Sequence, residues 1–240
     1  MAEMINVCIG IQARSTSTRF PRKVLELIDG KPILRHVIDS ANKAARFINR
    51  HTPKTGILVT VYVVIPEGDE IKRHFGHQVS LLEGPEQDVL TRYWKLAETT
   101  GADFIVRITA DCPLIPQSYI SKHVNCAVLN KYDYLSNVDE EIRLTPDGMD
   151  CEVISKRLLE YTFQTATDPT DREHVTLLMR KDPPAWAKVG HIIGFLDLAH
   201  LKLSVDTKED LERVRSEYQK LKNAVTKAEI KHGRDHVHRF

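Results

Sequence analysis

The run ILVTVYVVI, from Ile57 to Ile65, constrains the fold of this chain more than any other segment. It is almost wholly apolar and mostly β-branched, as is typical of a strand covered on both faces. Further strand patterns at 5–11, 79–82, 104–109 and 132–137 alternate with helical patterns at 33–48, 67–75, 87–98 and 115–129. This alternation predicts an α/β fold of three layers, with a mostly parallel, Rossmann-like sheet between helices.

The rhythm of the pattern changes after Asn137. A turn-rich piece precedes an alternating strand at 149–154, helices at 156–166 and 171–180, and one or two strands within 185–198. A parallel core strand is expected again at 201–205, followed by a helix from Thr207 to about Lys222. We therefore expect a domain over 1–221, an inserted lobe at about 138–200, and a charged, poorly ordered tail over 222–240. Metal binding by His232, His236 and His238 in that tail is the alternative.

Composition excludes several classes of function. The 34 basic and 33 acidic side chains nearly balance, so no overall field attracts nucleic acid. The four cysteines form no C-x-x-C pair, which argues against a zinc ribbon or a dithiol site. The amino terminus lacks the pattern of a signal peptide, and no apolar run is long enough to cross a bilayer. We expect a cytoplasmic protein without a nucleic-acid or membrane partner.

A cationic loop follows the first strand. Within ten residues it carries Arg14, Arg19, Arg22 and Lys23, just before the segment GKPILRHVI that opens a helix. Such a cluster repels itself unless an anion lies among the charges, and polar loop residues add backbone N–H donors. The loop lacks the glycines of the P-loop and of the dinucleotide fingerprint. It predicts a polyphosphate site, and a basic surface turn is the alternative.

Two aspartates follow strand patterns far apart in the chain. Asp111 comes directly after the strand FIVRIT, in a turn that Pro113 stiffens, where open α/β sheets place ligands. Asp206 ends the strand expected at 201–205, and Thr207 with Asp210 forms a capping box after it. Because the carboxyl ends of parallel strands meet at one edge of a sheet, we expect the two carboxylates to lie close together.

Five separated segments resemble one enzyme family. They read QARSTSTRFPRKVL from Gln12, GPEQDVLTR from Gly84, TADCPL from Thr109, PDGMDCE from Pro146 and LSVDTKEDLERV from Leu203. Together they resemble the cytidylyltransferases that activate sugar acids, nearest to the spore-coat polysaccharide branch, which is related to the acylneuraminate and 3-deoxy-octulosonate cytidylyltransferases. The resemblance extends to about Leu221. The chain departs from it at Arg22, where such enzymes often carry glycine.

The resemblance implies a nucleotidyltransferase fold and an activity. The enzyme would transfer CMP from CTP to a sugar acid or similar anionic acceptor and release pyrophosphate, with Mg²⁺ on Asp111 and Asp206. Catalysis would rest on Arg14, Arg19, Lys23 and Asp111. The implied nucleotide-binding residues are Gln12, Ala13, Arg14, Ser17, Arg19, Lys23, Asp88, Arg92, Thr109, Ala110 and Asp111. The implied acceptor-binding residues are Ser136, Asn137, Asp147, Gly148 and Glu152. The inserted lobe would join two copies in a homodimer.

Other readings remain open from the residues alone. The acceptor could be a phosphonate or a phosphorylated small molecule, and the chain could be a non-catalytic nucleotide-binding subunit. Asp88 and Arg92, four apart on a helix, could form a surface ion pair. Asp150 and Glu152 could form the solvent-exposed face of a strand. Arg107 could reach the nucleotide or pair with an acid, and His174 could act as a base or cap a helix.

Overall fold

A seven-stranded sheet forms the centre of the protein, in the order β5-β4-β1-β6-β8-β7-β9. The computed structural model describes residues 4–138, 143–193 and 197–237, with the backbone only from 225 onward. The parallel strands are β1 (Ile5–Gln12), β4 (Ile57–Pro66), β5 (Ser80–Gly84) and β6 (Phe104–Thr109). The others are β8 (Glu152–Ser155), antiparallel to β6, then β7 (Tyr134–Ser136) and β9 (Val189–His191). The three-layer, mostly parallel arrangement expected from the sequence is confirmed.

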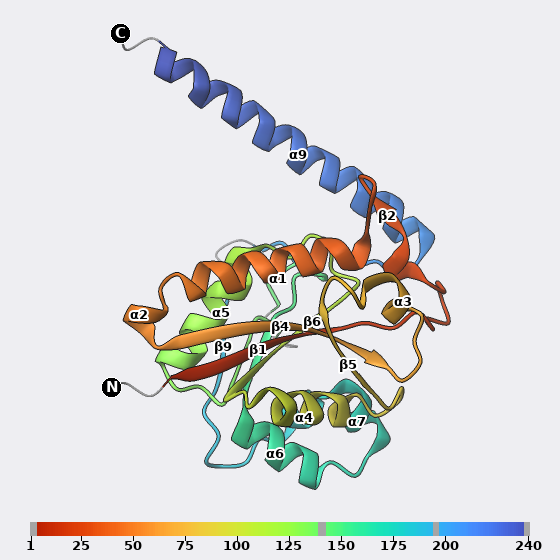
Figure 1. Cartoon of the computed structure of the whole chain (residues 1–240), viewed down its shortest axis with the longest axis vertical. Coiled ribbons are helices and arrows are strands. Elements are labelled where there is room, and N and C mark those ends of the chain that lie inside the picture. The colour runs from red at the N-terminus through yellow and green to blue at the C-terminus, as the bar shows by residue number, and fades with distance from the viewer. Residues whose placement is uncertain (1–3, 139–142, 194–196, 238–240) are drawn as a thin grey trace.

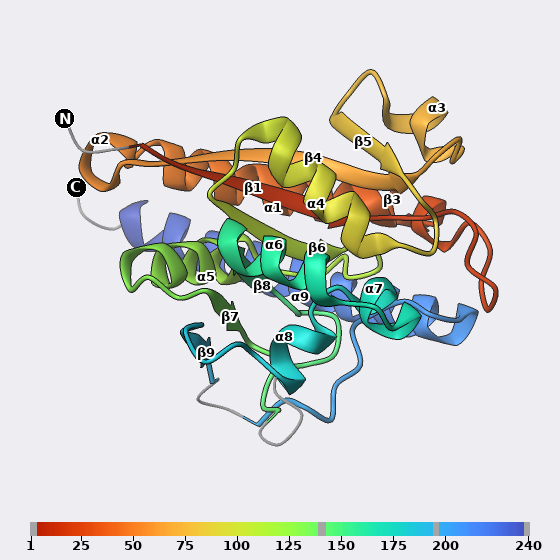
Figure 2. The same cartoon turned by 90° about the horizontal axis from the view of Figure 1, so that it is seen from below.

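Helices cover both faces of the sheet (Figures 1 and 2). One face carries α1 (Ile33–Asn49) and α5 (Gln117–Leu129). The other carries α4 (Val89–Thr100), α6 (Lys156–Thr165), α7 (Pro169–His174) and α8 (Leu177–Lys181). Short elements complete the chain: η1 (Lys23–Leu25), the hairpin β2 (Leu27–Ile28) and β3 (Lys31–Pro32), α2 (Thr52–Thr55) and α3 (Ile71–Phe75). Among the described helices, none is both long and apolar enough to cross a membrane.

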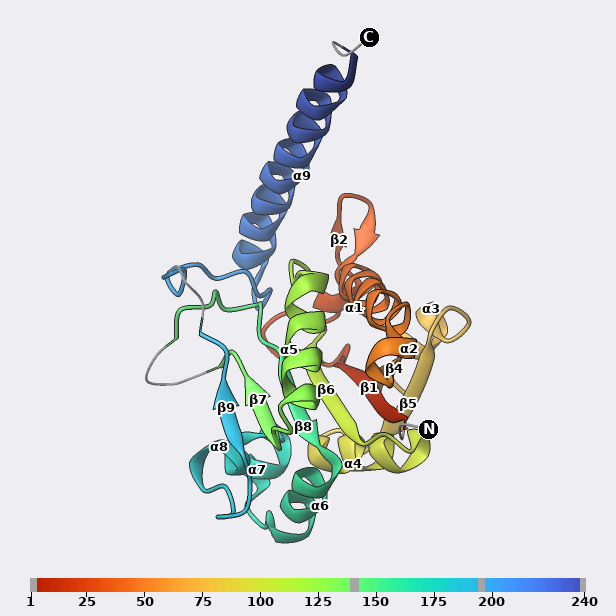
Figure 3. The ribbon, with the colours of Figure 1, turned by 90° about the vertical axis from the view of Figure 1, so that its left-hand side faces the viewer.

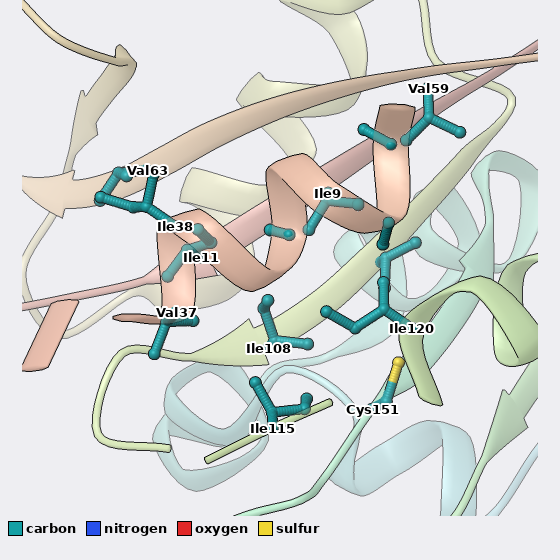
Figure 4. Packing of buried hydrophobic residues seen from close by; sticks show 14 of the residues in the cluster. Ile9, Ile11, Val37, Ile38, Val59, Val63, Ile108, Ile115, Ile120 and Cys151 are labelled. Atoms are coloured by element: carbon teal, nitrogen blue, oxygen red, sulfur yellow. The ribbon is translucent and has the colours of Figure 1, made fainter. Parts of the chain in front are cut away.

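Side-chain alternation along β1 builds two cores. Ile9 and Ile11 pack under α1 in the cluster drawn in Figure 4, and Cys8 enters the cluster on the α4 face. Gly10 lets α4 approach closely, because a Cβ there would lie 2.7 Å from the ring of Tyr93. The Tyr93 hydroxyl donates to the Gly10 carbonyl at 3.0 Å. The small residue in β1 therefore sets the distance between sheet and helix.

Three expectations need correction. The segment 201–205 is not a strand of the sheet: it forms a single parallel bridge, Asp147 to Lys202, because antiparallel β8 already pairs with the free edge of β6. The strand expected at 149–154 begins only at Glu152. Residues 149–151 instead bond to the side-chain amide of Asn137.

The chain after Val205 is the third correction. The helix expected to stop near Lys222 is α9 (Lys208–Val237), so most of the expected tail is helical, and it projects from the body (Figures 1 and 3). Of the histidines expected in the tail, His238 lies outside the described residues, and only the backbone is described at His232 and His236. Part of the expected lobe is integral to the sheet through β8 and β9.

Candidate active site

The cationic loop starts where β1 ends and closes with η1. Arg22 precedes η1 with a φ of 61°, the left-handed region that glycine adopts without steric cost. A glycine, which the resemblance described above leads one to expect here, would adopt this φ freely, whereas arginine carries about 1 kcal/mol of local strain. The Arg22 Nε is 2.9 Å from Glu70 Oε1, so its charge is directed away from Lys23 and toward α3.

A cavity of about 190 Å³ opens at the carboxyl ends of β1 and β6. It brings together most of the residues predicted to bind nucleotide and metal. Those lining it are Gln12, Ala13, Arg14, Ser17, Arg19, Lys23, Thr109, Ala110, Asp111 and Asp206. Thr18 and Val24 also line it and were not predicted. Asp88 and Arg92 are the predicted nucleotide residues that do not line this cavity.

Lys23 is the centre of the cavity's charge. Its ammonium lies 2.7 Å from Asp111 Oδ2 and 2.9 Å from Asp206 Oδ1. Burial alone would lower the pKa of Lys23, but the two carboxylates hold that pKa above its ordinary value. Burial raises the pKa of Asp206, and Lys23, Arg19 and Lys202 outweigh it, so the pKa is lowered. Lys23 and Asp206 are therefore both charged at neutral pH.

Hydrogen bonds outside the sheet, rather than a strand, place Asp206 in this cavity. The Val205 N–H donates to the Asp111 carbonyl at 2.9 Å, which places the two aspartates side by side. The backbone N–H groups of Asp206 and Thr207 donate to the Asp210 carboxylate, and the Thr207 hydroxyl accepts from the Asp210 N–H. The predicted capping box is thus confirmed. It fixes the start of α9 directly behind Asp206.

Most residues predicted to bind the acceptor have backbone or structural partners instead. Asn137 bonds to Met149 and Cys151, and Ser136 bonds to Val138. The main chain of Asp147 exchanges bonds with 201–203. Gly148 has a φ of 98°, and a Cβ there would lie 2.3 Å from the Ser204 nitrogen. Asp147 and Gly148 therefore contact the segment that leads to Asp206. Binding of an acceptor by any of these four residues stays a prediction.

Asp88 and Arg92 do not form the ion pair considered above. Asp88 caps α4 by accepting from the Thr91 N–H at 2.9 Å, and it also accepts from Arg172 at 2.9 Å. Arg92 is 1% exposed, and its Nε and Nη1 have no hydrogen-bond partner among the described residues. Burial lowers the pKa of Arg92, and the nearby charge of Arg14 lowers it further. A buried cation facing another cation favours an anion in this region.

A second cavity, also of about 190 Å³, adjoins the first and shares Thr109 with it. Its lining includes Arg107, Asp150, Glu152, His174, Thr176 and Arg180. His174 was considered above as a base or a helix cap, but this cavity was not predicted from the sequence. The sequence feature that could have indicated it is the polar pair His174 and Thr176 on either side of apolar Val175, in the segment DREHVT.

Glu152 is the fixed anion of the second cavity. It is 3% exposed, pairs with Arg107, and accepts from the Tyr134 hydroxyl at 2.6 Å. Burial raises its pKa, but Arg107 and the hydroxyls of Tyr134 and Thr176 hold the pKa below its ordinary value. Arg107 therefore pairs with an acid, and Glu152 is buried rather than on a solvent-exposed face.

Similarity to known proteins identifies the class and then the family. The chain has the fold of nucleotidyltransferases: a cytidylyltransferase from Leptospira borgpetersenii aligns over 88% of this chain and 86% of its own, with a TM-score of 0.77 and 28% identity. CMP:2-keto-3-deoxy-manno-octonic acid synthetase, solved in complex with CTP, shares the fold at a TM-score of 0.66 and 17% identity, over 90% of this chain and 99% of its own. The family profile described as Cytidylyltransferase matches residues 7–232. The chain belongs to the cytidylyltransferase family and is a CTP-dependent nucleotidyltransferase.

Two relatives in sequence are informative. The spore coat polysaccharide biosynthesis protein SpsF of Bacillus subtilis is 27% identical over 226 residues, which is 90% of this chain and 88% of that protein. The 3-deoxy-manno-octulosonate cytidylyltransferase of Geobacter sulfurreducens is 29% identical over 153 residues, 62% of this chain and 56% of the relative. The family predicted from the five motifs is confirmed.

Proposed function

We propose that this enzyme transfers CMP from CTP to a small anionic acceptor, with a sugar acid as the favoured class, and releases pyrophosphate. The observation that carries the proposal is the meeting of Asp111 and Asp206 on one cation, the ammonium of Lys23, inside an arginine-lined cavity. The two acids are distant in sequence and come together only in the fold.

The donor set fits Mg²⁺. Two carboxylate oxygens lie 2.7 and 2.9 Å from Lys23 Nζ. A single positive charge in the cavity can therefore contact both aspartates. Mg²⁺ takes one or two carboxylates and completes its shell with water and phosphate oxygens. Asp111 and Asp206 would hold Mg²⁺. When bound, the ion would neutralise charge on the phosphates.

Arg14, Arg19 and Lys23 would bind the β- and γ-phosphates and stabilise the pyrophosphate that leaves. Arg19 already lies 2.9 Å from Asp206, and its side chain is 66% exposed, so it is free to turn toward a triphosphate. An acceptor oxygen attacks the α-phosphorus in line, and the bond to the bridging oxygen breaks. Each loop cation would contribute about 3 kcal/mol to lowering the barrier, roughly a hundredfold in rate.

An anionic acceptor suits the residues around the cavities. A carboxylate, phosphate or phosphonate oxygen is already a nucleophile and needs no strong general base. The names of the relatives, which act in polysaccharide synthesis or on 3-deoxy-manno-octulosonate, support a sugar acid. The second cavity supports an acceptor site beside the phosphates, since Thr109 lines both. The homodimer and the cytoplasmic location stay predictions.

The test is Asp111→Asn in a pyrophosphate-release assay. CTP and Mg²⁺ are combined with 3-deoxy-manno-octulosonate, N-acetylneuraminate, a phosphosugar or a phosphonate. We expect the variant to fold, but its rate of pyrophosphate release should fall at least about a hundredfold, because one of the two carboxylates proposed to hold the metal is neutralised. Asp103→Asn, at the opposite end of β6 where Asp103 accepts from the Asn6 N–H, is the matched control. Wild-type turnover in Asp111→Asn would exclude the metal role. CTP binding without release for every acceptor would favour a non-catalytic subunit.

A further inference from the structure

Two residues that line the second cavity, together with the residue between them, belong to a segment that the phosphate site does not use. They are His174, Val175 and Thr176, from the motif DREHVT. His174 ends α7, is exposed, and lines the cavity. Thr176 lines it too, is 1% exposed, and hydrogen-bonds to Glu152. Val175 points the other way, into the core.

The backbone at Val175 is strained. Its φ is 58° and its ψ is −59°, and the Thr176 N–H donates to the His174 carbonyl at 2.5 Å. This is a three-residue γ-turn of the rare, strained type, and a β-branched residue is among the least suited to it. Strain of this kind persists only where the surrounding structure enforces it, and it concentrates at ligand sites.

Two anchors enforce the turn. The Val175 side chain is fully buried in the core cluster on the α4 face, together with Tyr134 and Leu158. On the α7 side, Arg172 Nε donates to Asp88 at 2.9 Å and Arg172 Nη2 to the Thr91 hydroxyl at 2.9 Å. Asp88 and Thr91 belong to the start of α4, so α7 is fixed to the core rather than to its own lobe alone.

The lining of the cavity has the chemistry of a polyhydroxylated anion. His174 and Arg180 offer N–H donors, Arg180 adds a positive charge, and Asp150 offers a carboxylate that can accept from hydroxyl groups. Glu152 is committed to Arg107, Tyr134 and Thr176, so it holds the lining in place instead of binding the ligand. The acceptor's reacting oxygen would then lie toward Thr109, the residue common to both cavities.

We propose that the strained turn at Val175 selects the acceptor, with His174 as a residue that contacts the acceptor and Val175 as the positioning residue that holds it. The inference rests on the proposed function and adds to it the residues that determine specificity. It also commits to the ligand class, a sugar or sugar acid carrying a carboxylate or phosphate.

Calorimetry with the full chain, Mg²⁺ and an α,β-methylene analogue of CTP tests the contact. The probes are 3-deoxy-manno-octulosonate, N-acetylneuraminate and glucose 1-phosphate. We expect His174→Ala to lower the affinity for the best-bound probe about tenfold, which is the effect of losing a hydrogen bond to a charged group. His174→Asn should recover part of the loss, and affinity for the CTP analogue should stay within about twofold. Glu173→Ala, an exposed neighbour outside the cavity, is the matched control.

Val175→Ala tests the positioning role against a merely structural one. Leu158→Ala truncates a residue of the same buried cluster and serves as its control. Val175→Ala should lower the affinity for the probe, whereas Leu158→Ala should leave that affinity unchanged. Both substitutions should lower the free energy of unfolding. The proposal is overturned if His174→Ala binds the probe as the wild type does, or if the wild type binds the CTP analogue but none of the three probes. Failure of the CTP analogue to bind would instead contradict the proposed function.

Discussion

At the scale of single residues, charge in the first cavity is organised around Lys23. The ammonium is nearly buried and bonds to two aspartates that come from distant parts of the chain. Asp111 could be predicted because it follows a clear buried strand. Asp206 was predicted to reach the same place, but by a strand that does not form. The meeting point was right because the capping box and the bond from Val205 to Asp111 replace sheet pairing.

Asp150 should make stability fall with rising pH. Burial raises its pKa to about 6, with Asp147 and Glu152 adding to the shift and Arg143 opposing it. The folded protein therefore holds this proton more tightly than the unfolded chain, and the stability this provides is present below the unfolded pKa and is lost as pH rises through about 6. Asp150→Asn should raise the free energy of unfolding by about 1–3 kcal/mol at pH 8 and by little at pH 4. Urea denaturation at both pH values checks this, and an equal difference at both would contradict it.

At the scale of elements, the sequence was most informative where one helix or strand was decided by its own pattern. The stripe of α1 and the apolar run of β4 both lie close to where they were expected. The antiparallel placement of β8 could not be predicted, since strand pairing depends on residues distant in the chain. That pairing sets Glu152 opposite Arg107 and so creates the second cavity. The candidate phosphate site was readable from local motifs, and the acceptor side was not.

Gly148 lies against the backbone of the segment that leads to Asp206. Alanine there would meet the backbone of Ser204 and would hold a φ of 98°, so the segment carrying Asp206 must move. We expect Gly148→Ala to cost about 1–3 kcal/mol of stability and to slow pyrophosphate release up to about a hundredfold, as small displacements of reacting groups do. Gly68→Ala is the control, because Gly68 has a φ of 75° but open space around it. Equal activity in the two variants would show that Gly148 does not position Asp206.

At the scale of the whole molecule, α9 is the element that departs most from the body (Figure 3). Its described contacts with the rest of the chain lie in its first half. Leu211 and Val214 pack with Phe20 and Ile28, Arg215 donates to Leu27, and Lys222 pairs with Asp29. The site needs only the start of this helix, which follows Asp206.

A chain ending at Ala224 should therefore keep its fold and its activity. We expect a free energy of unfolding within about 0.5 kcal/mol of the full chain, because the buried contacts of α9 remain. A chain ending at Glu209 is the control and should lose stability with Leu211 and Val214. Denaturation and pyrophosphate release measure both, and light scattering reports particle mass. A large loss of stability in the chain ending at Ala224, without a change in particle mass, would contradict the prediction.

The pairing of Lys23 with Asp206 spans 183 positions of the chain. A ribosome makes the protein from its amino terminus, so the cationic loop emerges long before the aspartate that completes its partner set. Until Asp206 has been translated, the nascent protein holds an arginine-rich loop with only one of the two aspartates that pair with Lys23. A fragment released before that point would carry the cations of the loop without the acidic pair proposed above to hold the metal ion.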